Sequence, residues 1–195
     1  DVSFLITQMG KWNAGADSRF VSKIDMEKIG VGGHSFGGYT TSWVAEIDDR
    51  IDAIVPMAGI APDLTKVNTT PLLVLMATED DTIGAVGNEI IRNYYATSTG
   101  PKYFVEFVDG GHYSFTEMFQ YRPNFGDGVG TGKRIGNGEA VTFTPKETVY
   151  RYTNGYSLAF LNKYVKGDTD ASLDAYLEAN HDDSVMIHKT APAQK

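Results

Sequence analysis

A serine placed between two glycines is the feature of this chain that most directly suggests chemistry. The segment reads Gly33-His34-Ser35-Phe36-Gly37, with an apolar, strand-like run before it and a helical pattern after it. A serine at such a sharp strand-to-helix corner takes a strained backbone conformation, and glycines two residues to either side leave room for the turn. The N-terminus of the following helix favours negative charge beside the hydroxyl. We therefore predict that Ser35 is a nucleophile.

Glycine-rich turns between a strand and a helix also occur in dinucleotide-binding loops. That motif, Gly-x-Gly-x-x-Gly, is disfavoured here because a serine stands where the third glycine after Gly30 and Gly32 belongs. A second glycine-rich stretch, residues 126–133, is not a phosphate-binding loop. Asp127 and Arg134 occupy the positions where that loop needs Gly and Ser or Thr.

Four histidines are candidates for the base that would activate the serine. His112 follows a predicted strand directly, in a Gly-Gly-His turn at the carboxyl edge of the sheet, where ligands bind in open α/β folds. We predict that His112 is the base for Ser35. His34 adjoins the nucleophile with its ring directed away, so a packing role is expected for it. His181 and His188 lie near the C-terminal end, where structural or solvated roles are expected.

Three acids follow the apolar run at residues 71–76, namely Glu79, Asp80 and Asp81. Clustered acids after a strand are commonly solvated turn residues, yet a base at His112 needs one of them to orient its ring. The residues by themselves leave the choice among the three open. The chain order, serine then acid then histidine, is that of the α/β-hydrolase triad.

The elements expected to position these residues alternate between strands and helices. The expected strands are residues 29–32, 51–57, 71–76 and 102–108. The expected helices are residues 1–13, the segment from the serine turn to Ile47, and residues 87–95, 147–164 (interrupted at Asn154-Gly155) and 172–180. The continuous apolar run at 71–76 is typical of a strand buried on both faces of a parallel sheet. This alternation predicts an α/β fold with a mainly parallel sheet and flanking helices, in a single domain over residues 1–195.

Two further segments depart from this alternation. Residues 117–146 are rich in glycine and poor in aliphatic side chains, which predicts a surface excursion beside the site that acts as a lid or contributes to substrate binding. Residues 191–195 are expected to be a disordered tail.

Composition excludes several classes of function. A formal net charge of -8 without a Lys/Arg cluster argues against nucleic acid as a partner. The absence of Cys removes disulfides, thiolate metal sites and a cysteine nucleophile. No run is apolar enough to predict a transmembrane segment. The acidic balance is compatible with a secreted or periplasmic protein but does not fix its location.

Three segments together resemble the α/β-hydrolase superfamily: Gly-His-Ser-Phe-Gly-Gly at 33–38, the strand and acidic cluster at 71–82, and Gly-Gly-His-Tyr-Ser-Phe at 110–115. The nearest look-alikes are dienelactone-hydrolase-like esterases, bacterial cutinases and lipases, and platelet-activating-factor acetylhydrolase-like enzymes. The resemblance covers residues 1–115 and, less closely, the helix at 147–165. In that group the acid is the last one of the cluster, before Thr or Ser and a small apolar segment, so the resemblance implies Asp81.

The resemblance implies a serine esterase or lipase that cleaves a small-molecule or lipid ester through an acyl-enzyme, without metal or organic cofactor. The residue after the nucleophile supplies an oxyanion-hole amide, which assigns Phe36 to that role. Tyr113 and Phe115 are candidates for binding substrate. Further apolar or amphipathic residues near the site in sequence, which form either a pocket or plain core, are Phe36, Tyr39, Met118 and Phe119.

The chain departs from the superfamily pattern before the nucleophile. Only 34 residues precede Ser35, whereas these enzymes carry several strands there, one of which leads to a second oxyanion-hole amide. We therefore expect that an N-terminal part is missing or supplied by a second polypeptide, and that the strand before the nucleophile presents an open edge for it.

Two alternatives remain open at this point. A peptidase of the prolyl-oligopeptidase type shares the Gly-x-Ser-x-Gly-Gly-Tyr pattern and the same order of triad residues. A non-catalytic, hydrolase-like binding module is the alternative from another class, although such proteins usually lose a member of the triad.

Overall fold

The main sheet of the molecule has five strands in the order β1-β2-β3-β4-β7. The computed structural model describes residues 1–121, 126–168 and 173–190, without the side chains of Phe119 and Thr190. Ser172 and the tail at 191–195, for which predictions were made, lie outside this range. The strands are β1 (Gly30–His34), β2 (Ala53–Met57), β3 (Leu72–Ala77), β4 (Lys102–Phe107) and β7 (Val185–Thr190). The first four are mutually parallel, and β7 runs antiparallel to β4.

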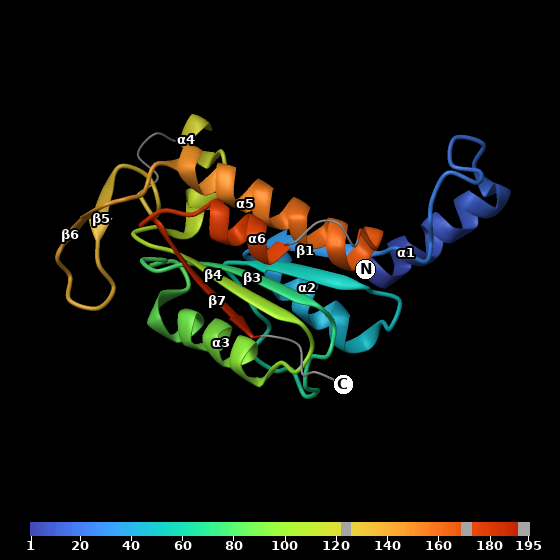
Figure 1. Cartoon of the computed structure of the whole chain (residues 1–195), viewed down its shortest axis with the longest axis horizontal. Helices are drawn as coiled ribbons and strands as arrows, with labels where there is room; N and C mark the ends of the chain where they lie inside the picture. The colour runs from blue at the N-terminus through green and yellow to red at the C-terminus, as the bar shows by residue number, and fades with distance from the viewer. Residues whose placement is uncertain (122–125, 169–172, 191–195) are drawn as a thin grey trace.

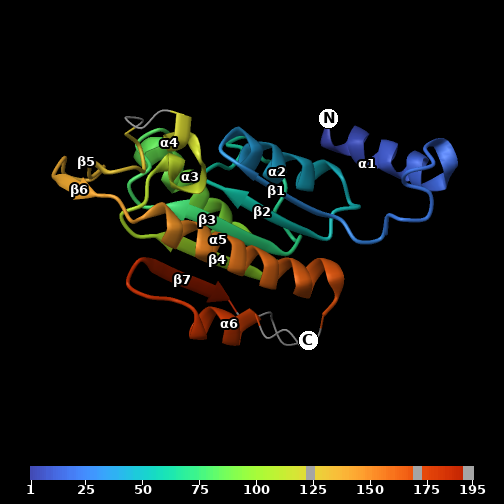
Figure 2. The ribbon, with the colours of Figure 1, turned by 90° about the horizontal axis from the view of Figure 1, so that it is seen from above.

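Helices cover both faces of this sheet (Figure 1). The helices are α1 (Val2–Lys11), α2 (Phe36–Ile47), α3 (Gly84–Thr97), α4 (Met118–Tyr121), α5 (Lys146–Leu161) and α6 (Leu173–Ala179). Figures 1 and 2 show α5 and α6 on one face and α2 and α3 on the other. The predicted α/β fold, a mainly parallel sheet with flanking helices, is confirmed.

Strand β3 connects the two layers of core. All six of its residues are buried. Leu73 and Leu75 belong to the apolar cluster with α5 and α6, whereas Leu72, Val74 and Met76 belong to the cluster with α2 and α3. Because successive side chains of a strand point to opposite faces, the uninterrupted apolar run fills both layers. The prediction of a strand buried on both faces is confirmed.

Two features of the C-terminal part differ from the prediction. Helix α5 runs without interruption through Asn154-Gly155. Residue 155 is glycine because the Tyr176 hydroxyl of α6 packs so closely there that a Cβ would collide with it. Strand β7 was not predicted. It is an edge strand whose Val185 and Ile187 face the core, while the intervening Met186 is 44% exposed, and an alternation this short is easily missed.

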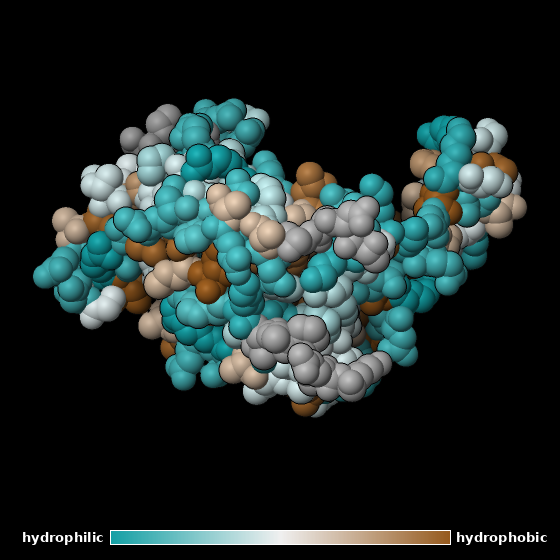
Figure 3. Space-filling model, in the orientation of Figure 1, coloured by the Kyte–Doolittle hydropathy of each residue, from teal (hydrophilic) through white to brown (hydrophobic). Residues whose placement is uncertain are grey.

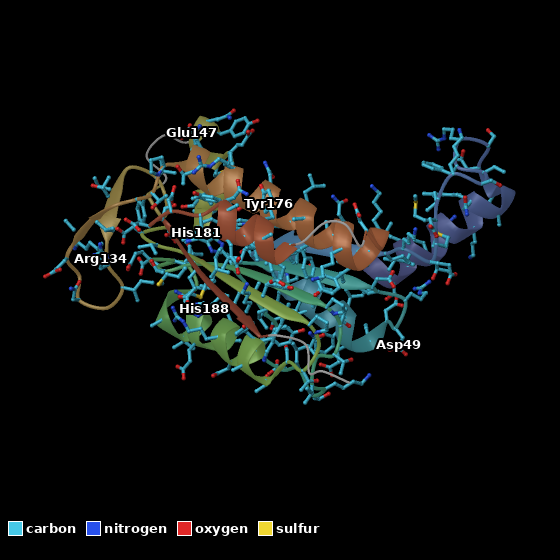
Figure 4. All side chains as sticks on the ribbon, viewed as in Figure 1. Asp49, Arg134, Glu147, Tyr176, His181 and His188 are labelled. Carbon is cyan, nitrogen blue, oxygen red and sulfur yellow. The ribbon has the colours of Figure 1, made fainter. Side chains whose placement is uncertain are left out.

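The two C-terminal histidines lie at the end of α6 and on β7, where Figure 4 labels them. His188 is on β7, with Nε2 3.1 Å from Glu106 Oε1. His181 Nδ1 lies 3.1 Å from the Leu177 carbonyl oxygen, at the end of α6. Both interactions hold secondary structure together, as the sequence predicts.

The glycine-rich segment has structure of its own. It contains α4 and an antiparallel hairpin of β5 (Thr131–Lys133) and β6 (Ala140–Thr142), and its residues 122–125 lie outside the described part. Arg134, which Figure 4 labels on this hairpin, donates to Asp109 Oδ1 at 2.6 Å and to Glu79 Oε1 at 3.2 Å. The hairpin is therefore anchored to the loops that follow β3 and β4.

Strand β1 forms one edge of the sheet and, among the described strands, pairs with β2. Helix α1 extends away from this edge as a projecting arm, on which Figure 3 shows apolar side chains among polar ones. Phe4 and Leu5 of α1 are 66% and 55% exposed, whereas Ile6 is buried. The expectation that a further strand pairs with β1 stays a prediction. None of the helices in the described part of the chain combines the length and apolar character needed to cross a membrane.

Candidate active site

The turn at Ser35 has the strained geometry that the sequence predicts. Ser35 has φ 57° and ψ -117°, a left-handed value that residues with a side chain rarely adopt, and its amide donates to the Met57 carbonyl at 2.8 Å. The turn joins β1 directly to α2. Strain of this kind aims the hydroxyl out of the sheet at the carboxyl ends of the strands.

The glycines around Ser35 are required for reasons that differ in part from the prediction. A Cβ on Gly33 would lie 2.5 Å from the Gly37 backbone, so Gly33 is required. A Cβ on Gly37 would meet nothing within 4 Å, because this residue points out of the first turn of α2. The second required glycine is Gly38, whose Cβ would lie 2.5 Å from the Gly59 carbonyl oxygen. The helix thus rests directly on the backbone after β2.

A chain of hydrogen bonds joins three strand ends. His112 Nε2 lies 2.8 Å from Ser35 Oγ, and His112 Nδ1 lies 2.8 Å from Asp80 Oδ2. The side chains of His112 and Asp80 are 2% and 0% exposed. A carboxylate accepts, so Nδ1 carries the proton, and Nε2 of the neutral ring is free to accept from the Ser35 hydroxyl. The proton order is therefore the one in which a histidine can take a proton from a serine.

The acid beside His112 is Asp80, which corrects the choice of Asp81 that the resemblance implied. Asp80 is turned inward, where Oδ1 also accepts from the Ile83 amide at 3.1 Å. Asp81 is exposed. Glu79 is buried but turned the other way, toward Arg134 and the Ile135 amide, which donates to Oε2 at 2.8 Å. The three neighbouring acids therefore have three different surroundings, and the sequence pattern does not distinguish them.

His34 contacts His112 directly, which is more than the packing role predicted for it. Its Nε2 donates to the His112 carbonyl oxygen at 2.8 Å, and the two ring centroids are 4.7 Å apart. Burial, followed by the proximity of His112, lowers the pKa of His34. A neutral His34 that supports the backbone of His112 is the resulting arrangement.

Two grooves meet at Ser35. The first, which we name the Phe36 groove, has a volume of about 410 Å³ and is lined mainly by apolar residues, among them Phe36, Tyr39, Ile60, Ile83 and Val86. The second, the Tyr113 groove, has about 320 Å³ and is lined by His112 with Tyr113, Thr116, Glu117, Met118 and Tyr121. Ser35 contributes to both.

The other predicted site residues are placed as follows. Phe36 is the first residue of α2, so its amide is one of those that a helix leaves without an intrahelical partner. Tyr113 lines the Tyr113 groove. Phe115 lines neither groove; its ring packs against those of Phe107, 5.4 Å away, and His34, 5.8 Å away. The candidate Phe115 is therefore a packing residue, because the turn after His112 directs it into the core.

Sequence reasoning missed Asp127, whose Oδ1 accepts from the His112 amide at 3.0 Å. Asp127 lies in the glycine-rich segment between Gly126 and Gly128, where an acid normally indicates only a turn. No local signal links it to a histidine 15 residues earlier in the chain. Within the described residues, no group of three His, Cys, Asp or Glu side chains is arranged to hold a metal ion.

Comparison with known proteins identifies a family and a relative of this chain. The sequence model of the family described as "PETase: PET hydrolase-like" matches residues 4–122. The chain is also similar to Lipase 1 of Moraxella sp. (strain TA144), with 33% identity over 112 residues, which is 55% of this chain and 34% of the lipase. The chain thus matches about a third of that relative's length.

Titration of His34 tests its environment. Because its folded pKa lies below the unfolded value, the unfolded state binds more protons between the two values, so the stability that neutral His34 contributes is lost as pH falls through that window. NMR titration of the imidazole protons should give His34 a midpoint below the ordinary value of 6.5. A midpoint at or above that value contradicts the buried, neutral ring.

Proposed function

The chain belongs to the PET hydrolase-like family, and from this premise we propose that it cleaves carboxylic esters through an acyl-enzyme intermediate on Ser35. The observation that carries the proposal is the hydrogen-bonded chain from the Ser35 hydroxyl through the His112 ring to the Asp80 carboxylate. The similarity to a lipase supports an ester, rather than a proline-containing peptide, as the substrate.

The proposed reaction begins with proton transfer from Ser35 to His112 Nε2 while Oγ attacks the ester carbonyl carbon. The carbonyl oxygen becomes an oxyanion that accepts a hydrogen bond from the Phe36 amide at the N-terminus of α2. Asp80 stabilises the imidazolium through Nδ1–H. The same ring then protonates the leaving alcohol, and water attacks the acyl-enzyme by the reverse sequence of steps.

The two grooves suggest how a small-molecule or lipid ester would lie. The leaving oxygen must be next to His112 Nε2 to be protonated, so the alcohol part would extend along the Tyr113 groove, which His112 lines. The acyl part would then follow the Phe36 groove, past the Phe36 amide. The side chains of Ile60, Val86 and Ile90 in that groove favour an apolar acyl group.

Replacing the nucleophile tests the proposed function. Ser35→Ala should lower kcat for p-nitrophenyl ester hydrolysis by on the order of 10⁶, because the covalent step is removed. Wild-type protein should also be labelled by a fluorophosphonate at Ser35, and the variant should not. Hydrolysis that survives the substitution overturns the proposal. Hydrolysis of proline-containing peptides but not of esters would favour the peptidase, and an unlabelled, inactive wild type would favour a binding module.

A matched pair of variants tests the choice of acid. Asp80→Asn should lower kcat by about 10⁴, because an amide at this position holds the wrong tautomer of His112. Asp81→Asn removes the same charge from an exposed neighbour and should leave kcat nearly unchanged. Steady-state kinetics of the two proteins measures the difference. The opposite ranking would return the role to Asp81.

A further inference from the structure

Asp127 joins the two loops that carry Asp80 and His112. One carboxylate oxygen, Oδ1, accepts from the His112 amide at 3.0 Å, in the loop after β4. The other, Oδ2, accepts from the amide of Thr82 at 2.8 Å and from its hydroxyl at 2.5 Å, in the loop after β3. The Asp127 carbonyl oxygen also accepts from the Tyr113 amide at 2.9 Å. A single side chain therefore bridges both loops.

The bridge lies where the sheet no longer holds the loops together. Backbone hydrogen bonds from Thr78 to Phe107 and from Glu79 to Gly110 link the two loops just beyond β3 and β4. Asp80 and His112 come one and two residues further on. The Asp127 carboxylate binds Thr82, two residues after Asp80, and the backbone amide of His112 itself. The spacing between the Asp80 carboxylate and the His112 ring thus depends on a segment from elsewhere in the sequence.

The fit between this segment and the histidine loop is close. A Cβ on Gly111 would collide with Asp127 Oδ1 and with the Gly128 backbone. Gly128 has φ 103°, which favours glycine, and its carbonyl oxygen accepts from the Ser114 hydroxyl at 3.2 Å. Ser114 is fully buried, and its Oγ accepts from the Gly111 amide at 3.0 Å. Residues 126–128 therefore fit against this loop in a single position.

The hairpin of β5 and β6 holds the same two loops at other points. Arg134 bridges Glu79 and Asp109, and the Thr144 hydroxyl donates to the Val108 carbonyl at 2.6 Å. The hydrogen bond to Asp109 and the charge of that carboxylate, with a smaller contribution from Glu79, raise the pKa of Arg134. Residues 126–146 are thus attached to the loops after β3 and β4 at several places. These contacts favour a supporting role for the segment over that of a lid.

We propose that Asp127 is a positioning residue that holds the Asp80 loop and His112 in the geometry needed for proton transfer. This inference rests on the proposed function of Ser35, His112 and Asp80. The backbone N–H groups of His112 and Thr82 both need an acceptor, and only a carboxylate presents one acceptor oxygen to each of them. Misplacing a reacting group by about 1 Å costs up to about 100-fold in rate, so a residue that touches no substrate can control kcat.

The test is Asp127→Asn with Glu139→Gln as the matched control. The asparagine amide offers one acceptor and turns an NH₂ group toward a second N–H donor, so one arm of the bridge is lost. We expect kcat for p-nitrophenyl ester hydrolysis to fall by about 10- to 100-fold. KM should stay within about twofold, because Asp127 lines neither groove. Glu139→Gln removes a charge from an exposed position of the same segment and should change neither constant.

Amide hydrogen exchange gives a second readout that does not depend on catalysis. Asp127→Asn should speed exchange at the amides of Thr82 and His112 and leave those of β3 and β4 unchanged. Unchanged kcat, unchanged exchange at both amides, or an equal effect of Glu139→Gln overturns the inference. If Ser35→Ala leaves hydrolysis intact, the proposed function fails, and the exchange rates still decide whether Asp127 holds the two loops.

A milder variant covers the case in which Asp127→Asn does not fold. Thr82→Ala removes only the hydroxyl donor to Asp127 and leaves the amide contact in place. A several-fold fall in kcat at constant KM supports the inference, and an unchanged kcat overturns it. Where Asp127→Asn does fold, the effects of the two substitutions should be less than additive, since they act on one bridge.

Discussion

The buried hydrogen bond between His112 and Asp80 is the interaction on which the site depends. Both side chains are almost completely removed from solvent, so neither can exchange its partner for water. The bond fixes the ring plane and keeps the proton on Nδ1, which leaves Nε2 to accept from Ser35. A carboxylate buried without this donor would be costly, so the pair stabilises its own arrangement.

The fold brings these groups together by a simple route. Parallel strands end at the same edge, so the residues after β1, β3 and β4 meet there although they are far apart in the chain. Close contacts at Gly33, Gly38 and Gly59 set the height of the Ser35 turn above β2. The glycine-rich segment then links the loops from outside the sheet, through Asp127 and Arg134. The strands and the glycine-rich segment thus together align the three residues of the site.

Local signals were enough to predict part of this arrangement. The strained turn at Ser35, the buried run of β3 and the placing of His112 after β4 each follow from a short stretch of sequence. The choice between Asp80 and Asp81 does not, because it depends on which carboxylate the loop turns inward. The sequence predicts a helix break at Gly155, and only the packing of Tyr176 against this residue explains the glycine. Asp127 acts only through tertiary contacts, and for that reason sequence patterns do not reveal it.

The most direct test of the account is the NMR signal of the proton on His112 Nδ1. Its burial and its bond to a carboxylate should protect it from exchange and move its resonance far downfield of ordinary imidazole protons. We expect such a signal in the wild type, its loss in Asp80→Asn and its persistence in Asp81→Asn. Absence of the signal in the wild type, or its loss only in Asp81→Asn, would contradict the central claim that Asp80 orients His112.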